Sequence, residues 1–378
     1  MKDLRMVDLK GQYDRIKTEI DAAIQSVINS TVFIRGPEVI NFEEELASYL
    51  GVRHVISCAN GTDALQVALM ALGLEPGDEV ITTNFTFIAS VEVIALLGLK
   101  PVFVEPEPDT FNISPEAIEK AIGPKTRAII PVHLFGQSAD MEEILRIASK
   151  HDLFIIEDVA QATGAEYIFS DGTRKKAGAM GDMGCTSFFP SKNLACFGDG
   201  GAIFTNDDGL AKMARSITNH GSTRRYYHDD IGVNSRLDAI QAAILRIKLR
   251  YLDEYNNSRR NAASFYDRQL NQIEKVISPF RSNKSTHIFH QYTIKTDPGK
   301  RDNLVNYLEE KGIPSMVYYP VPMHRQKAYS FLGLDDEAFP VTNALCSSVL
   351  SLPMHTELNI NQLKFICDNI NKFFEDNR

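Results

Sequence analysis

The sequence predicts an α/β fold with a large domain at residues 1–240, built on a doubly wound and mostly parallel sheet, and a smaller α+β domain at residues 241–378. Up to about residue 240, short runs rich in Val, Ile and Phe alternate with stretches of helical periodicity. This alternation is typical of parallel strands connected by helices. Helical, strand-like and helical segments follow it, and a chain of 378 residues can bury one large and one smaller core.

Two amphipathic helices, at about residues 12–28 and 39–50, are expected first, because apolar residues recur there at helical spacing. A turn at residues 59–62 leads from the first strand into a helix. The strands of the large domain are expected at residues 55–58, 79–83, 101–104, 128–133, 154–157, 186–189 and 202–205. The helices between them are expected at residues 88–97, 115–121 and 141–151.

Two further local signals follow along the chain. Asp171-Gly172 favours a hairpin turn inside a polar insertion. A long helix is expected to begin at Arg236, with Ser235 and Asp238 resembling a capping box.

Composition excludes several classes of protein. The net charge of −9 and the pI near 5.6 argue against a surface for nucleic acid or an anionic membrane. The N-terminus has no apolar signal-type segment, and the longest apolar runs are too short to span a bilayer, so we expect a cytoplasmic protein. Five widely spaced cysteines without a C-x-x-C pair indicate buried reduced thiols, and we expect no metal site.

Lys192 is the central candidate for chemistry. Phe188, Phe189 and Pro190 precede it, and an apolar run ending at Phe197 follows. Most lysines are solvated surface charges, but an apolar pocket lowers the pKa of an amine and makes it a nucleophile toward carbonyl groups. The residues around Lys192 therefore suggest Schiff-base chemistry.

Two more segments lie where predicted strands end. Asn60, Gly61 and Thr62 open a helix, whose free N–H groups can hold a phosphate, although a simple helix cap explains the same residues. Asp158 follows a strand and could hold a cationic ring nitrogen in the crevice of an open sheet, with structural capping as the alternative. No glycine fingerprint for a nicotinamide cofactor is present.

Two loops are candidate substrate edges. Residues 219–236 form the most basic and aromatic stretch of this acidic chain, which suits either a solvated loop or the rim of an anion-binding pocket. Residues 318–324 form a stiff, proline-containing loop. His133 receives no role, because a lone histidine at a strand end is more often a core residue.

Four ordered motifs resemble the DegT/StrS-type nucleotide-sugar aminotransferases, which are pyridoxal-phosphate enzymes of the aspartate-aminotransferase fold, called fold type I, with a seven-stranded sheet. The motifs are Gly61-Thr62-Asp63-Ala64-Leu65, Glu157-Asp158-x-Ala160-Gln161-x-x-Gly164-Ala165, Ser187-Phe188-Phe189-Pro190-Ser191-Lys192-Asn193 and Gly232-x-Asn234-x-Arg236. Tyr319-Pro320-x-Pro322 and Leu352-Pro353-Met354-His355 also match, so the resemblance extends from about Val7 to the last helix.

The resemblance implies a role for each matching residue. Lys192 would form a Schiff base with pyridoxal 5'-phosphate and move the proton, and Asp158 would pair with the ring nitrogen. The remaining cofactor ligands would be Asn60, Gly61, Thr62, Ser187, Gln161, Phe87 stacked on the ring, and Asn234 from a neighbouring subunit. Arg236, Tyr319 and His324 would contact substrate.

The implied activity is transfer of the amino group of L-glutamate to a nucleotide-linked keto sugar in the synthesis of bacterial surface polysaccharide, including lipopolysaccharide, by a homodimer with shared sites. The form of the Lys192 motif resembles members that aminate C3 of a UDP- or dTDP-linked 3-keto sugar, such as a UDP-2-acetamido-3-keto sugar. Amination at C4 of a 4-keto-6-deoxy sugar and a regulatory protein that binds the cofactor without turnover are the alternatives.

Overall fold

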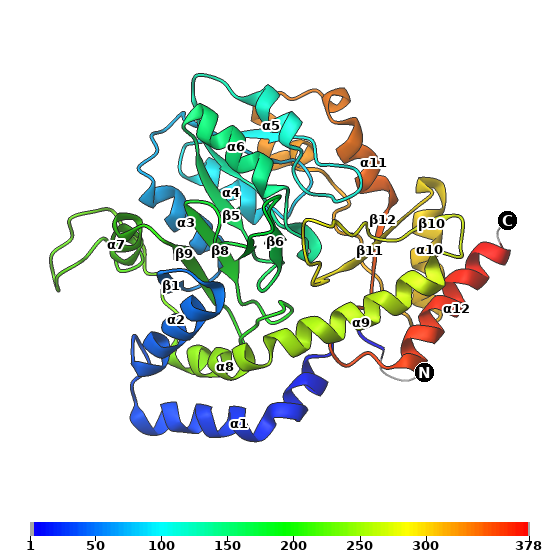
Figure 1. Ribbon diagram of the computed structural model, residues 1–378, viewed down its shortest axis with the longest axis horizontal. Helices are drawn as coiled ribbons and strands as arrows, with labels where there is room; N and C mark the ends of the chain where they lie inside the picture. The colour runs from blue at the N-terminus through cyan, green and yellow to red at the C-terminus, as the bar shows by residue number, and fades with distance from the viewer. Residues whose placement is uncertain (1–3, 377–378) are drawn as a thin grey trace.

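A seven-stranded, mostly parallel sheet forms the centre of the computed structural model, which describes residues 4–376 (Figure 1). The strand order is β1-β9-β8-β5-β4-β2-β3. Only β9 runs antiparallel to its neighbours, β1 and β8. The strands are β1 (His54–Cys58), β2 (Glu79–Thr83), β3 (Lys100–Val104), β4 (Thr126–Ile130), β5 (Phe154–Asp158), β8 (Met183–Ser187) and β9 (Gly201–Thr205). All seven predicted strands are therefore confirmed.

Helices cover both faces of this sheet. Buried residues of α3, α4 and α7 pack on one side of the strands, and those of α5 and α6 pack on the other. These helices are α3 (Gly61–Ala71), α4 (Ala89–Leu96), α5 (Pro115–Ala121), α6 (Met141–His151) and α7 (Asp208–Ile217). Sequence patterning missed α7, although Asp207 caps it by accepting a hydrogen bond from the Leu210 N–H at 2.8 Å.

Four helices connect the large sheet to the rest of the chain: α1 (Leu9–Ser30), α2 (Pro37–Leu50), α8 (Ala239–Arg250) and α9 (Leu252–Leu270). Phe42 and Leu46 of α2 share a core with Ala242 and Leu245 of α8. Helix α9 contributes Leu252 to this core and its later residues to a second core (Figure 1). The two cores thus divide within α9, not between residues 240 and 241, because α8 buries its apolar residues against α2.

The second core lies between a three-stranded antiparallel sheet and the C-terminal helices. Its strands are β10 (Val276–Ile277), β11 (Tyr292–Thr296) and β12 (Val349–Leu352), and its helices are α10 (Pro298–Glu310) and α12 (Ile360–Asp376). Helix α11 (Pro340–Ser348) buries Leu345 and Cys346 in another cluster, with Phe85 and Phe135. The predicted hairpin is formed by β6 (Glu166–Ile168) and β7 (Arg174–Lys176). Short 3-10 turns are η1 (Leu134–Gly136), η2 (Met323–Arg325), η3 (Lys327–Leu332) and η4 (Asp336–Ala338).

Two local predictions were wrong. Strand β8 ends at Ser187, before Phe188 and Phe189. The Phe188 N–H still donates to the Gly200 carbonyl in register with β9, and the chain then turns, with the Lys192 N–H donating to the Phe189 carbonyl. Helix α8 begins at Ala239, and Ser235 does not cap it. The Ser235 hydroxyl oxygen instead accepts a hydrogen bond from the Ala59 N–H at 3.0 Å.

The five cysteines are all buried and unpaired, as the sequence predicted. Among residues 4–376, no helix is long and apolar enough to cross a membrane.

Candidate active site

The segments predicted to carry chemistry meet on one side of the large sheet, where several strands have their carboxyl ends. Strand β5 is parallel to β8, and β1 points the same way as β8 because each is antiparallel to β9. The carboxyl ends of β1, β5 and β8 therefore lie at the same edge. Asp158 ends β5, Ser187 ends β8, and helix α3 begins three residues after the last residue of β1. This edge is where open α/β sheets bind ligands.

The N-terminus of α3 is tightly packed against β8 and β9. The Asn60 side-chain oxygen accepts a hydrogen bond from the Asp63 N–H at 2.8 Å. A Cβ atom on Gly61 would lie 2.6 Å from the Ser187 Cβ, and one on Gly201 would lie 2.3 Å from the Asn60 carbonyl oxygen. Glycine at both positions thus brings the helix N-terminus and the Ser187 hydroxyl together, in an arrangement that suits an anion.

Asp158 is held in place from two sides. Its side chain accepts hydrogen bonds from the Ser90 hydroxyl at 2.7 Å and from the Ala160 N–H at 3.1 Å. Because the single hydroxyl proton of Ser90 goes to Asp158, the Thr86 hydroxyl donates to Ser90 at 3.1 Å. Asp158, Ser90 and Thr86 are all buried. Sequence patterning did not find Ser90, which precedes Asp158 by 68 residues and belongs to helix α4.

Lys192 lies in the turn after β8, where its N–H donates to the Phe189 carbonyl at 2.9 Å. Among residues 4–376, no side chain forms a hydrogen bond or ion pair with its ammonium group. Burial lowers the pKa of Lys192 to about 8, and the charge of Asp158 opposes this shift. At pH 7 the amine is therefore still mostly protonated, but about 10% of it is in the neutral form that acts as a nucleophile.

Asn193, the residue after Lys192, anchors this turn to helix α9. Its side-chain amide donates to the Asn256 side-chain oxygen at 2.7 Å, and both residues are buried. The Asn193 oxygen also lies 3.3 Å from Nδ1 of the buried His290. The turn that carries Lys192 is thus fixed by polar contacts to the part of the chain that leads into the second core.

Gln161 links the large sheet to the loop at residues 318–324. Its Oε1 accepts a hydrogen bond from the Phe135 N–H at 2.7 Å, and its Nε2 donates to the Tyr319 hydroxyl at 3.0 Å. The Tyr319 ring lies 6.3 Å from the ring of Phe87, which is 54% exposed. Burial raises the pKa of the Tyr319 hydroxyl, so this group remains protonated.

The buried, hydrogen-bonded carboxylate of Glu157 stabilises the backbone just before Asp158. Glu157 accepts a hydrogen bond from Nε2 of His133 at 2.8 Å and from the N–H groups of Gly178, Met180 and Gly181 at 2.7 to 2.8 Å. Burial alone would raise the pKa of Glu157, but these donors outweigh it and the pKa is lowered. His133 therefore has a structural role at the strand end, which agrees with the sequence analysis, where it was given no catalytic role.

The family model for the DegT/DnrJ/EryC1/StrS aminotransferase family matches residues 14–371, which include all of these elements. The chain belongs to this family. A UDP-2-acetamido-2-deoxy-3-oxo-D-glucuronate aminotransferase of Pseudomonas aeruginosa is 47% identical over 365 residues, covering 96% of this chain and 98% of the relative. A pleiotropic regulatory protein of Geobacillus stearothermophilus is 46% identical, covering 98% of each chain.

The fold of this family member is also shared with solved aminotransferases. The crystal structure of S. venezuelae DesV superimposes with a TM-score of 0.95 at 40% identity and covers 99% of each chain. The mostly parallel seven-stranded sheet and its flanking helices are therefore those of the pyridoxal-phosphate enzymes of fold type I, as the sequence predicted.

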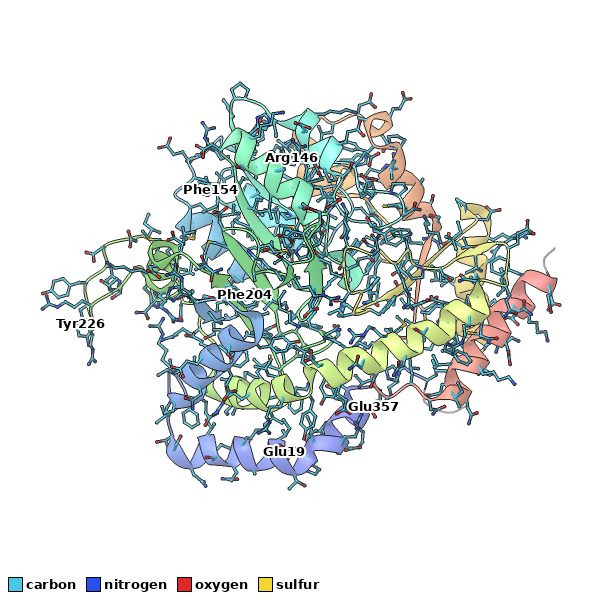
Figure 2. The ribbon with its side chains drawn as sticks, in the orientation of Figure 1. Glu19, Arg146, Phe154, Phe204, Tyr226 and Glu357 are labelled. Atoms are coloured by element: carbon cyan, nitrogen blue, oxygen red, sulfur yellow. The ribbon has the colours of Figure 1, made fainter. Side chains whose placement is uncertain are left out.

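Two more predicted site residues, His324 and Asn234, belong to the segments at residues 318–324 and 219–236. His324 is buried, with its ring nitrogens 2.7 Å from the Asn84 amide and 2.8 Å from an Asp336 oxygen, so it stabilises the 318–324 loop. Asn234 pairs with Asn219 at the base of the loop that projects beyond α7. Tyr226, near the tip of this loop, is 80% exposed and points away from the body of the subunit (Figure 2).

Proposed function

We propose that this aminotransferase uses pyridoxal 5'-phosphate to transfer the amino group of L-glutamate to C3 of a nucleotide-linked keto sugar in bacterial surface-polysaccharide synthesis. The observation that carries the proposal is the unpartnered amine of Lys192, with its pKa lowered to about 8, at the strand edge that also carries Asp158. The name of the P. aeruginosa relative supports a UDP-linked 2-acetamido-3-keto sugar as the acceptor.

The residues present fit this cofactor. The packing of Gly61 against Ser187 leaves the N–H groups of Gly61 and Thr62, with the Thr62 and Ser187 hydroxyls and the Asn60 amide, to hold a phosphate. Asp158 would hold the ring nitrogen. Gln161 and the exposed ring of Phe87 would position the rest of the ring, and Asn234 would reach the phosphate from a second subunit.

The bound cofactor would serve as an electron sink that stabilises a carbanion at the carbon being aminated or deaminated. The Asp158 carboxylate, fixed by Ser90, would retain a proton on the ring nitrogen. Lys192, in its neutral form, would accept the proton from the donor carbon, and in the second half of the reaction its ammonium form would deliver a proton to the sugar carbon that receives the amino group. Gln161 would position the phenolic oxygen of the cofactor ring, and Tyr319, bonded to Gln161, would position the part of the substrate next to it.

The absorbance spectrum of the purified protein tests the first half of this function. A visible band that shifts to shorter wavelength after addition of L-glutamate would support both cofactor and donor. Lys192→Ala would abolish the band and the turnover, whereas Lys175→Ala, at an exposed lysine of β7, would retain both. Turnover by the Lys192→Ala variant would contradict the proposal.

Product analysis tests the second half. NMR of the amino sugar formed from a UDP-linked 3-keto sugar should place the new nitrogen on C3, and efficient conversion of a 4-keto-6-deoxy sugar instead would favour C4 amination. A protein that binds the cofactor but is unchanged by amino donors would favour the regulatory alternative, a role named for the G. stearothermophilus relative.

The shared site of a homodimer can be tested by complementation. Mixed dimers of the Lys192→Ala and Asn234→Ala variants contain one site with both native residues if Asn234 acts on the neighbouring subunit. Activity that exceeds the sum of the two separate variants is expected. No gain on mixing would show that each chain supplies its own Asn234.

A further inference from the structure

The buried ring of His290 lies beside Asn193, the residue that follows Lys192 in the turn after β8. The Asn193 side-chain nitrogen donates to the Asn256 side-chain oxygen at 2.7 Å and to the Ile288 carbonyl at 3.4 Å. The oxygen of the same amide therefore faces His290, at 3.3 Å from Nδ1 of the ring. Because an amide oxygen only accepts hydrogen bonds, Nδ1 of His290 carries a proton and donates it to Asn193.

The second ring nitrogen of His290, Nε2, faces the side-chain nitrogen of Gln291 at 3.5 Å. An amide nitrogen only donates, so Nε2 carries a lone pair and the ring is neutral. Burial, followed by the charges of Lys192 and Arg259, holds the pKa of His290 well below its usual range, which agrees with a neutral ring. His290 is thus an uncharged imidazole whose single proton lies on the nitrogen next to Asn193.

The backbone that carries His290 is fixed independently of Asn193. The Ile288 N–H donates to the Gly136 carbonyl at 2.9 Å, and a Cβ on Gly136 would lie 2.8 Å from the His290 nitrogen, so only glycine permits this approach. The guanidinium group of the buried Arg259 donates to the His290 carbonyl at 3.3 Å. The ring is therefore held by its own segment and can orient the Asn193 amide.

We propose that His290 is a positioning residue for Lys192, acting through the Nδ1–H group that it donates to Asn193. Because Asn193 and Lys192 are adjacent, a fixed Asn193 amide restricts the backbone of the turn and the directions open to the Lys192 side chain. A fixed turn also limits the access of water to the amine, and this loss of solvation is what lowers its pKa. The neutral ring achieves this without adding a charge beside the amine. The importance of this position for amino transfer rests on the proposed function, whereas the arrangement itself exists in the cofactor-free protein.

The test compares three substitutions of His290 in the cofactor-free protein. His290→Asn keeps a neutral donor in the place of Nδ1, His290→Gln places its donor near the position of Nε2, and His290→Leu has no donor. Each protein is treated with pyridoxal, the products are trapped with borohydride, and mass spectrometry measures the labelling of the peptide that contains Lys192. The dependence of this labelling on pH gives the apparent pKa of the amine. Pyridoxal lacks the phosphate, so the measurement requires neither phosphate binding nor turnover.

The apparent pKa of Lys192 should stay near 8 in the wild type and in His290→Asn. It should rise toward 10.5 in His290→Gln and His290→Leu, because a looser turn admits water to the ammonium group. A rise from 8 to about 8.5 already lowers the neutral fraction at pH 7 about threefold. The control His287→Gln alters another buried histidine, whose Nδ1 accepts a hydrogen bond from the Phe289 N–H at 3.1 Å, and should leave the pKa of Lys192 unchanged.

Several results would overturn the proposal. The same apparent pKa in wild type and all three His290 variants would show that His290 does not act on Lys192. An equal rise in His290→Asn and His290→Gln, or a comparable rise in His287→Gln, would leave His290 with a packing role alone. No response of the wild type to pyridoxal phosphate and L-glutamate would refute the proposed function, and the labelling of Lys192 would still report on His290.

NMR of the wild-type protein with nitrogen-15 in its histidines tests the proton position even if the Gln and Leu variants do not fold. The signals of His290 are identified by their absence from His290→Asn. A proton on Nδ1 and no titration between pH 5 and 8 are expected. A proton on Nε2, or titration near the ordinary pKa of 6.5, would contradict the donation to Asn193.

Discussion

Replacing Lys192 with methionine should stabilise the cofactor-free protein at neutral pH. Methionine has a similar length and no charge, so it removes the penalty of burying an ammonium group that has no partner. The ordinary pKa of 10.5 is lowered to about 8 in the folded protein. At about 1.4 kcal/mol for each tenfold change, this difference corresponds to about 3 kcal/mol, which is an upper limit because the side chain is only partly buried. The same shift raises the neutral fraction of the amine at pH 7 from about 0.03% to about 10%.

The sign of the effect follows from proton linkage. Between pH 8 and 10.5 the unfolded chain binds more protons at Lys192 than the folded chain, so the wild-type protein gains stability relative to the variant as the pH rises through this window. Urea unfolding of both cofactor-free proteins at several pH values from 7 to 10 measures the difference. The advantage of Lys192→Met should be largest at pH 7 and should shrink above pH 8. A variant that is no more stable at pH 7, or whose advantage is independent of pH, would refute the reasoning about burial of this amine.

Three further predictions concern the surroundings of Lys192. Gly61→Ala should weaken binding of pyridoxal phosphate at least about tenfold in a fluorescence titration, because the added Cβ would lie 2.6 Å from the Cβ of Ser187. The control Gly123→Ala should leave this affinity unchanged. Equal affinities of the two variants for pyridoxal phosphate would contradict the packing argument. Glu157→Gln should reduce the free energy of unfolding, measured in urea, by about 3 kcal/mol at pH 7. Because the pKa of Glu157 is lowered, the difference in unfolding free energy between wild type and variant should shrink as the pH falls below 4.5. A difference that does not change with pH would be inconsistent with an ionised Glu157. Ser90→Ala should reduce kcat about tenfold with little change in the urea midpoint, because it removes the hydroxyl that donates to Asp158. An unchanged kcat would assign Ser90 a packing role only.

The sequence predicted most of the large domain because its signals are local. The strand boundaries at residues 79–83 and the helix boundaries at residues 115–121 and 141–151 agree with the structure to the residue. Hydrophobic periodicity and turn residues act within a few positions, so they can be read without knowing the fold. The resemblance of ordered motifs added the family and the residues expected to hold the cofactor.

Elements whose role depends on distant contacts were predicted less well. Serine is a residue type that often caps helices, yet the hydroxyl oxygen of Ser235 accepts a hydrogen bond from the N–H of Ala59, which lies 176 positions earlier in the chain. Helix α8 continues past the expected domain boundary because its apolar side chains complete the core around α2. The contacts of His324 with Asn84 and Asp336, which lie 240 and 12 positions away in the chain, are likewise set by the fold.

The sequence by itself determined the order of most strands and helices along the chain, the position of Lys192 after a strand, and the family. These features depend on neighbouring residues and on the order of motifs. Only the tertiary structure decided which groups surround those residues. Ser90 next to Asp158 and Tyr319 next to Gln161 are pairs separated by 60 residues or more in the chain. Parallel strands with long connections bring such pairs together at one sheet edge, and no local pattern encodes which of them will meet.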